Sequence, residues 1–265
     1  MKTPRRAVRP RFAEERQSAI ERRLRETGRV EVAALAAEYR VSEDSIRRDL
    51  RGLAERGLVH KTHGGAIALQ PSAMPMAQRG DVKAEVKRAI GRRAAARVQP
   101  HQTLFIDSGT TALALAQALA APEAPRPLTV ITTAIDVALL LGSDARVRLV
   151  LAGGEWSPET RAFSGPQAEA ELRAHRADWA FLGACALHPR LGLSASLAGD
   201  ASMKRAMLEC ALQRVLLADA SKFDAVQPQR VAGLDQLDVV ITDAAPAWLR
   251  TRVKTVERVA VAQPR

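Results

Sequence analysis

Along the first quarter of the chain, apolar residues recur at steps of three and four, the period of helices with one buried face. These steps predict helices over about residues 13–26, 32–39 and 43–56. Two short β-prone runs follow, Leu58–Thr62 and Ala66–Leu69, on either side of a turn at His63, Gly64 and Gly65. Three helices and a hairpin predict a winged helix-turn-helix over residues 12–69, whose third helix enters the DNA major groove.

The third predicted helix has a clear start signal. Ser42 is expected to be its N-cap, because the hydroxyl can accept a hydrogen bond from a free N–H of the first turn. Glu43 and Asp44 place negative charge at the positive end of the helix dipole. The residues expected on its apolar face are Ile46, Leu50 and Leu53.

The other face of this helix carries arginines, which can donate two hydrogen bonds to guanine or bind phosphate. The alternative is a solvated face on which Arg48 pairs with Asp44 one turn earlier. On the hairpin, His60, Lys61 and His63 either meet phosphates or form a polar edge. The candidate DNA-binding residues are Ser42, Ser45, Arg47, Arg48, Arg51, Lys61 and His63.

From Val82 onward the pattern changes to short apolar runs alternating with helical stretches. The runs, expected to be strands, cover residues 103–106, 129–131, 147–151, 179–182, 214–218 and 239–241. The helical stretches lie at about 86–98, 112–121, 136–141, 168–174 and 202–212. This alternation predicts a second domain over residues 82–262, with a mostly parallel sheet covered by helices on both faces. Residues 70–81, with prolines and no periodicity, are expected to be the linker.

Charge separates the two predicted domains. The whole chain has 40 Lys and Arg against 29 Asp and Glu, for a net charge of +11. Residues 1–80 hold 17 basic and 10 acidic side chains, so the first domain carries most of the excess, as expected for a domain that meets a polyanion. Residues 1–11 are expected to be a disordered basic tail that either touches DNA phosphates or only aids solubility.

Other features limit the class of protein. No apolar run approaches the ~18 residues that a membrane span requires, and no apolar segment follows the basic N-terminus, so a cytoplasmic protein is expected. Cys185 and Cys210 lack metal-site spacing and are expected to be buried free thiols. No metal, cofactor or catalytic group is expected.

In parallel α/β folds, ligands bind at the carboxyl ends of the strands, where this sequence becomes polar. The first strand leads through a hydroxyl-rich turn with one glycine into a helix N-terminus, a ready anion site. Neither the P-loop nor the dinucleotide motif is present. The candidate effector-binding residues are Asp107, Ser108, Gly109, Thr110, Thr111, Thr132, Gly153, Gly154, Lys204, Asp219 and Lys222.

Each of these residues also has a structural interpretation. Asp107 and Asp219 are then strand-end caps, Lys222 is a surface charge, and Gly153 and Gly154 are turn glycines. The convergence of hydroxyls, backbone N–H groups and two lysines at successive strand ends favours a phosphate and a polyol.

The first domain contains four motifs at fixed spacing: Arg16-x3-Ile20-x3-Leu24, Ser42-x2-Ser45-Ile46-Arg47-Arg48-Asp49-Leu50, Gly57-Leu58-Val59 and His63-Gly64-Gly65-Ala66. Through these motifs it resembles the DeoR family of bacterial transcriptional regulators. One departure is Ser45, where the family usually has threonine; both residues supply a hydroxyl.

The second domain resembles the family's C-terminal domain, which is related in fold to ribose-phosphate isomerases and is understood to sense phosphorylated sugars. The matching segments are Asp107–Thr111, Leu151–Gly154, Phe181–Ala184, Gly192–Ser194, Lys204–Met207 and Asp219-x-Ser221-Lys222-Phe223. Departures occur at Thr133, usually asparagine, and at Asp224, usually glycine, while Asp200 stands for an acid usual before the helix lysine. Through Thr103–Thr111 and Leu151–Glu155 the chain looks nearest to glycerol-3-phosphate regulon repressors.

The resemblance implies a repressor of a carbohydrate or polyol operon. It would bind double-stranded operator DNA as a homo-oligomer, dimer or tetramer, and a phosphorylated sugar or polyol would release it. The alternative is a sugar-phosphate isomerase-like enzyme with an accessory basic domain. Such an enzyme needs a general base, and Asp107, Asp200 and Asp219 are candidates by residue type only.

Overall fold

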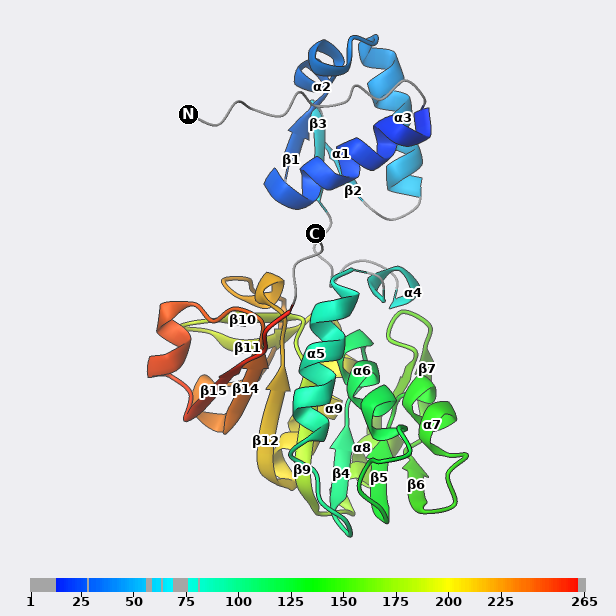
Figure 1. Cartoon of the computed structure of the whole chain (residues 1–265), viewed down its shortest axis with the longest axis vertical. Coiled ribbons are helices and arrows are strands. Elements are labelled where there is room, and N and C mark those ends of the chain that lie inside the picture. Colours follow the sequence, from blue (N-terminus) through cyan, green and yellow to red (C-terminus); the bar gives the residue numbers. More distant parts are fainter. Residues whose placement is uncertain are drawn as a thin grey trace. The chain divides into compact units, whose positions relative to one another are not determined.

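The computed structural model describes residues 13–27, 29–55, 59–62, 64–68, 76–80 and 82–261. The chain forms two compact units, one ending at Met74 and the other beginning at Pro75 (Figure 1). The tail expected over residues 1–11, the candidate His63 and residues 70–75 and 81 of the expected linker lie outside the described part.

The first unit is a winged helix-turn-helix. Its elements are α1 (Ala13–Thr27), β1 (Arg29–Glu31), α2 (Val32–Tyr39), α3 (Glu43–Glu55), β2 (Val59–Thr62) and β3 (Gly65–Ala68). The three strands form an antiparallel sheet in the order β1-β3-β2, with β2 and β3 as the wing. The sequence did not predict β1, because three residues are too few to show an alternating pattern and only the pairing with β3 makes them a strand.

The core of this unit confirms the predicted apolar faces. Ile20 and Leu24 of α1 and the expected face of α3 are at most 2% exposed. Arg40, in the left-handed conformation with φ 55°, ends α2, and its N–H donates to the Ala36 carbonyl. The resulting short turn brings α3 across α2, the arrangement that the helix-turn-helix pattern predicts.

The second unit is built on a seven-stranded sheet in which every neighbouring pair is parallel. In spatial order the strands are β15 (Thr255–Arg258), β14 (Val239–Thr242), β12 (Ala211–Leu217), β9 (Ala177–Gly183), β4 (Thr103–Ile106), β5 (Leu128–Thr132) and β6 (Val147–Leu151). Because all seven run the same way, their carboxyl ends meet at one edge. This edge collects the polar segments that follow β4, β9 and β12.

Helices cover both faces of the sheet, as predicted. One face packs against α5 (Ala84–Ala95), α6 (Thr110–Leu119) and α7 (Ile135–Leu141). The other packs against α8 (Pro166–Arg173) and α9 (Ala198–Glu209). In Figure 1, α5 and α6 lie in front of the central strands. Successive residues of a strand point to opposite faces, so Leu104 and Ile106 join the first core and Phe105 joins the second.

Several elements were not predicted. A hairpin of β7 (Glu155–Ser157) and β8 (Ala162–Ser164) follows β6, and a small antiparallel sheet contains β10 (Ala186–His188), β11 (Gly192–Ala195) and β13 (Gln229–Ala232). These strands have three or four residues each, too few to show an alternating pattern. β7 pairs with β8, and β10 with β11, across short turns, whereas β13 joins β11 from far along the chain. The helix expected to reach Leu212 ends at Glu209, because Ala211 already pairs with Ala177 in the sheet.

Part of the expected linker is structured. Residues 76–79 form the short helix α4 (Met76–Arg79), which belongs to the second unit. Met76 is 5% exposed, and the Arg79 guanidinium donates to the carbonyl of Glu159, 3.0 Å away, in the β7–β8 hairpin. These contacts attach α4 to the second unit.

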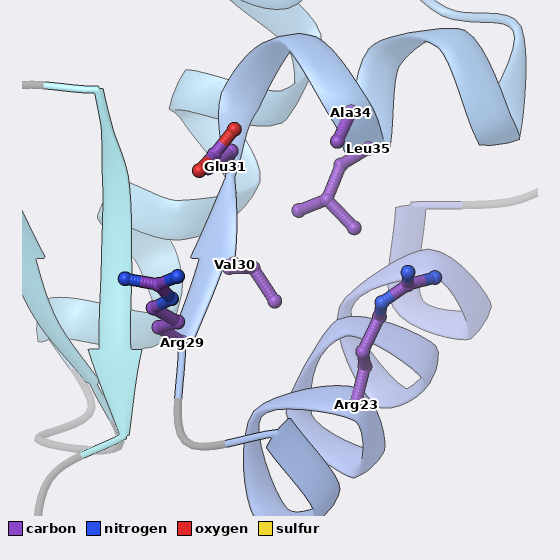
Figure 2. A pocket seen from close by; sticks show the side chains of 6 residues that line it. All are labelled: Arg23, Arg29, Val30, Glu31, Ala34 and Leu35. Carbon is purple, nitrogen blue, oxygen red and sulfur yellow. The ribbon is translucent and has the colours of Figure 1, made fainter.

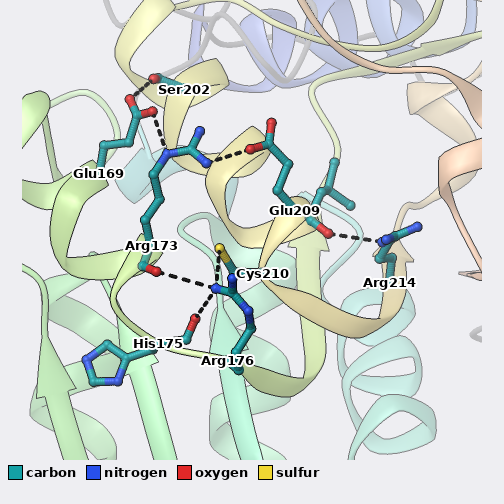
Figure 3. Close-up of polar contacts among 9 residues, drawn as sticks. Glu169, Arg173, His175, Arg176, Ser202, Glu209, Cys210 and Arg214 are labelled. Carbon is teal, nitrogen blue, oxygen red and sulfur yellow. Dashed lines mark hydrogen bonds and ion pairs between the residues drawn. The ribbon is translucent and has the colours of Figure 1, made fainter.

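Polar contacts hold α8 and α9 together on the far face of the sheet (Figure 3). Glu169 accepts from Arg173, 3.0 Å away, and from the Ser202 hydroxyl, while Arg173 also pairs with Glu209. Below them, Arg176 donates to the sulfur of Cys210.

Both cysteines are free thiols; Cys210 is buried as expected, whereas Cys185 is only half-buried because it lies at the open edge of the sheet. Within the described residues, no helix combines the length and the apolar character needed to cross a membrane.

Candidate DNA-binding surface and ligand site

The N-terminus of α3 is capped by its own hydroxyls. The Ser45 N–H donates to Ser42 Oγ at 3.2 Å, and the two side-chain oxygens lie 2.9 Å apart. Ser42 is therefore the N-cap that the sequence predicted. Both hydroxyls are already engaged in the free protein, so a contact to DNA would have to share or replace these hydrogen bonds.

The arginine face of α3 is exposed, but the ion pair is not the one considered from the sequence. Arg47 pairs with Glu43 at 2.7 Å and with Asp44 at 3.3 Å, whereas Arg48 pairs with neither. Arg48 and Arg51 are exposed and form no ion pair with any described residue. An exposed pair of this kind is worth only about 0–1 kcal/mol, so DNA could release Arg47 at small cost.

The sequence missed how α3 is fixed to the rest of the unit. Asp49, 2% exposed on the buried side of α3, forms an ion pair with Arg16 of α1 and accepts from Gln17 Nε2 at 3.3 Å. The signal was an acid beside the apolar positions Ile46 and Leu50. Through Asp49, α1 holds the recognition helix at a fixed orientation.

On the wing, Lys61 of β2 is exposed and pairs in register with Ala66 of β3. A separate pocket lies between α1, β1 and α2 (Figure 2). Its lining residues are Arg23, Arg29, Val30, Glu31, Ala34 and Leu35. It shares no residue with α3 or the wing, so it is not part of the candidate DNA surface.

In the second unit, Asp107 and Lys204 form a buried ion pair at the carboxyl edge of the sheet. Asp107 follows β4, is 1% exposed, and accepts from the Gly183 N–H at 2.9 Å. Lys204 of α9 pairs with Asp107 and, at 3.0 Å, with Asp200. Burial opposes the charge of Lys204, yet the two carboxylates outweigh it and raise the pKa of this lysine above its ordinary value. Lys204 is therefore a charged group that is already neutralised.

The turn after β4 presents backbone N–H groups. Gly109, with φ +99°, is the N-cap of α6, and no side chain caps this helix. A residue with a Cβ is strained at this φ, which explains the glycine. Ser108 and Thr111 are buried, and Gly109 and Thr110 are half-buried. The first turn of α6 thus retains the free donors and the positive dipole end of an anion site.

A pocket opens beside this turn. Ser108 lines it together with residues from three other segments, and the sequence did not predict that these segments meet. The other lining residues are Thr133, Ser157, Thr160, Ala162, Phe163, Ser164, Leu197, Gly199, Asp200 and Met203. Five hydroxyl groups and one carboxylate therefore face a small cavity, a lining suited to a polyhydroxy ligand. The β7–β8 hairpin supplies much of this wall.

Of the eleven candidate effector-binding residues from the sequence, only Ser108 lines this pocket. Thr132 is fully buried, donates to the Ile106 carbonyl at 2.6 Å and accepts from the Ala134 N–H, so its hydroxyl is already used internally. Gly153 and Gly154 lie just before β7, and a Cβ on Gly154 would stand 2.4 Å from the Ser164 carbonyl oxygen. The close approach of the hairpin requires that glycine.

Asp219 and Lys222 lie at the next strand end but differ in their partners. Asp219 Oδ1 accepts from the Ser221 N–H at 3.0 Å and pairs with Lys83 Nζ at 3.1 Å, so it caps the 3-10 turn Ala220–Lys222. Lys222 is 8% exposed and is not the surface charge considered from the sequence. Burial lowers the pKa of Lys222, and Asp219 partly offsets this.

The sequence also missed two cations near Lys222. Lys87 of α5 is 5% exposed, and burial lowers its pKa to about 8 despite the nearby Asp219 charge. The signal was the position of Lys87 three residues before Ile90 on the buried face of α5. Arg79 of α4 lies within electrostatic reach of Asp200, and burial lowers the pKa of its guanidinium. No group of three or more His, Cys, Asp or Glu in the described structure is arranged to hold a metal ion.

Family models match both units. A model described as the DeoR C terminal sensor domain matches residues 82–244, and one described as the DeoR-like helix-turn-helix domain matches residues 16–72. The chain belongs to the DeoR family of transcriptional regulators. The resemblance stated from the sequence is therefore confirmed.

Relatives of this DeoR-family chain are named as regulators. It is 30% identical to the putative aga operon transcriptional repressor of Escherichia coli O157:H7, over 86% of each chain. It is 32% identical to the glycerol-3-phosphate regulon repressor of Escherichia coli strain K12, over 88% of this chain and 91% of that protein.

Solved structures are similar in fold only. Ribose 5 phosphate isomerase A from Neisseria gonorrhoeae is 17% identical, over 52% of this chain and 53% of that one, with a TM-score of 0.38. The Pyrococcus horikoshii OT3 translation initiation factor eIF-2B is 16% identical, over 86% and 80%, with a TM-score of 0.43.

Proposed function

We propose that this protein represses a carbohydrate or polyol catabolic operon and that a phosphorylated sugar or glycerol 3-phosphate releases it from its operator. The supporting observation is that one chain combines an exposed arginine face on α3 with a buried polar pocket beside an uncapped helix N-terminus. The first feature suits DNA, and the second suits a small phosphorylated polyol.

In this proposal α3 reads bases and the wing binds the backbone. Arg47, Arg48 and Arg51 reach base edges or phosphates in the major groove, and Lys61 contacts a phosphate without sequence preference. His63, outside the described residues, follows Lys61 on the wing and is kept as a candidate from the sequence alone.

The phosphate of the effector accepts from the free N–H groups at the start of α6, and Lys222 contributes a charge-assisted hydrogen bond. The hydroxyls of Ser108 and Thr133 meet the polyol part. Lys204, which Asp107 and Asp200 already neutralise, positions these carboxylates and the turn. Glycerol 3-phosphate is the first candidate effector, supported by the relative that is a glycerol-3-phosphate regulon repressor.

Sensing fits the geometry better than isomerisation. A general base needs a carboxylate that can face a substrate carbon. Asp200 lines the pocket but pairs with Lys204, as the buried Asp107 does, and Asp219 accepts from Ser221 and pairs with Lys83. Incubation with ribose 5-phosphate tests this choice, because measurable turnover would favour the enzyme.

The decisive experiment is a titration of a preformed protein–operator complex with phosphorylated sugars and polyols. DNA from upstream of the protein's own gene serves as the operator. We expect one of them, with glycerol 3-phosphate as the first choice, to weaken DNA binding about 5- to 150-fold, the range of a typical allosteric coupling. Operator DNA must then weaken effector binding by the same factor. If no phosphorylated compound changes the affinity, the effector assignment fails.

A further inference from the structure

Four basic residues gather at the carboxyl edge of the sheet, and of these only Lys222 has so far been assigned a role. Arg79 ends α4, Lys83 is the N-cap of α5, Lys87 lies one turn further along α5, and Lys222 ends the 3-10 turn after β12. Asp219 lies among them and forms an ion pair with Lys83 at 3.1 Å. The cluster therefore keeps an excess of positive charge in a largely buried place.

The hydrogen bonds of this cluster are incomplete. Lys87 Nζ donates to the Arg79 carbonyl, and Arg79 Nη2 donates to the Glu159 carbonyl at 3.0 Å. The Nε atom of Arg79 is buried and has no partner among the described residues. The Lys222 side chain, 8% exposed, likewise forms no hydrogen bond or ion pair with the part of the chain that the structure describes. A buried donor left unsatisfied is costly, and more so when it is charged, so Arg79 Nε is set to receive an acceptor, and the Lys222 ammonium can supply a second donor.

The Arg79 guanidinium and the Lys222 ammonium lie at the same edge of the sheet. Burial lowers the pKa of Arg79, and electrostatic interactions with Cys185, just after β9, and with Asp200 of α9 oppose that effect. The charge of Arg79 in turn acts on Lys222. Arg79 is thus close to the edge where β9 and β12 end. Its hydrogen bond to the β7–β8 hairpin places it beside the pocket that Ser108 and this hairpin line.

We propose that Arg79 and Lys222 together bind the phosphate group of the effector, with Arg79 as a ligand-contacting residue of α4. This inference rests on the proposed function and adds to it a second cationic contact. Guanidinium groups bind phosphate with two parallel hydrogen bonds, so the free Nε and the adjacent amino group suit a phosphate better than a neutral hydroxyl. Because α4 begins directly after the boundary between the two units, a bound phosphate restrains the first helix that follows the connection to the DNA-binding unit.

The test measures binding of inorganic phosphate, glycerol 3-phosphate and glycerol to the full chain by isothermal titration calorimetry. Arg79→Gln and Lys222→Gln should each weaken binding of both phosphate compounds at least about tenfold, the loss of one charge-assisted hydrogen bond. Arg79→Lys should recover part of the loss because it keeps the charge. Arg92→Gln, which removes an exposed charge from α5, is the matched control and should bind as wild type does.

The outcomes separate this inference from the proposed function. If Arg79→Gln lowers the thermal stability but leaves the affinity for inorganic phosphate unchanged, Arg79 only fastens α4 to the hairpin and the inference is wrong. If Arg79→Gln and wild type release operator DNA at the same glycerol 3-phosphate concentration, the inference fails and the proposed function stands. If phosphate binds in an Arg79-dependent manner but no phosphorylated compound affects DNA binding, the anion site stands and the proposed function fails.

Discussion

At the scale of single residues, the buried pair of Arg16 and Asp49 determines how α3 is held. Asp49→Ala leaves the Arg16 guanidinium without its carboxylate, and breaking such a pair is strongly destabilising. We expect a loss of about 2–4 kcal/mol in the free energy of unfolding, below the usual range because Arg16 keeps some exposure. Urea denaturation of the full chain measures it. Glu55→Ala, an exposed change on the same helix, should stay within about 0.5 kcal/mol of wild type.

The pKa of Lys87 gives a second prediction at this scale. Burial, with smaller contributions from Lys222, Arg79 and Lys83, lowers this pKa to about 8, although Asp219 opposes them. A bound anion stabilises the charged form, so its binding should take up protons near and above pH 8. Affinity for sulfate, which does not titrate in this range, should fall as the pH rises past 8.

Calorimetry in buffers of different ionisation enthalpy detects this proton uptake. Lys87→Met should reduce the uptake, and an undiminished value in that variant would assign it to another group. Without a bound anion, the pH dependence of the folding stability has the opposite direction to that of anion binding. Between about pH 8 and the ordinary lysine pKa the unfolded chain holds more protons, so this group makes the fold more stable as the pH rises through that window.

At the scale of elements, α3 and the wing should contribute differently to DNA binding. Arg48→Ala should lose about 1–3 kcal/mol of specific binding if the guanidinium contacts a base, whereas Lys61→Ala should weaken all sequences alike and reduce the salt dependence. Electrophoretic mobility assays with operator and scrambled DNA measure both. Arg22→Ala removes the same charge from α1 and should not change the preference for operator. Unchanged discrimination in Arg48→Ala would remove this residue from base recognition.

The packing of α5 against α6 depends on one glycine. A Cβ on Gly91 would stand 2.5 Å from the carbonyl carbon and oxygen of Ala114, so Gly91→Ala forces the helices apart. We expect a loss of about 1–3 kcal/mol, although alanine is the better helix former. Gly52→Ala is the control, because its Cβ would meet only Gln17 Nε2 at 3.6 Å and should stabilise α3 slightly. Equal thermal stability of the Gly91 variant and wild type would contradict the close contact.

At the scale of the whole molecule, one recognition helix reads too few base pairs to select an operator, so we predict a homo-oligomer held through the second unit. Among the described residues, the exposed large hydrophobic side chains all lie in that unit, which fits this arrangement: Leu139, Trp156, Leu191, Leu197, Leu212 and Val226. Light scattering at micromolar concentration should give a dimer or tetramer. A monomer that still binds its operator would contradict this prediction.

The sequence by itself determined the local structure of this protein. Period, capping and turn residues specified α1, α2, α3 and the wing, and six of the seven strands of the large sheet, because these signals depend on neighbours within a few positions. It also indicated that polar segments follow the strands, and in a parallel sheet such segments meet at one edge. Ser42 as the N-cap of α3 and the buried face of Ile46, Leu50 and Leu53 were predicted for the same reason.

Only the tertiary structure decided which charged groups are satisfied. Arg16 and Asp49 are 33 residues apart in the sequence, and Asp107 and Lys204 are 97 apart. No local sequence pattern predicts that either pair forms. The same is true of β1 and of the β7–β8 hairpin, which are too short to have a period of their own. Two carboxylates neutralise Lys204, whereas Lys222 forms no ion pair with the described residues. Burial and long-range partners, rather than residue type, therefore determine whether the charge of a lysine is compensated.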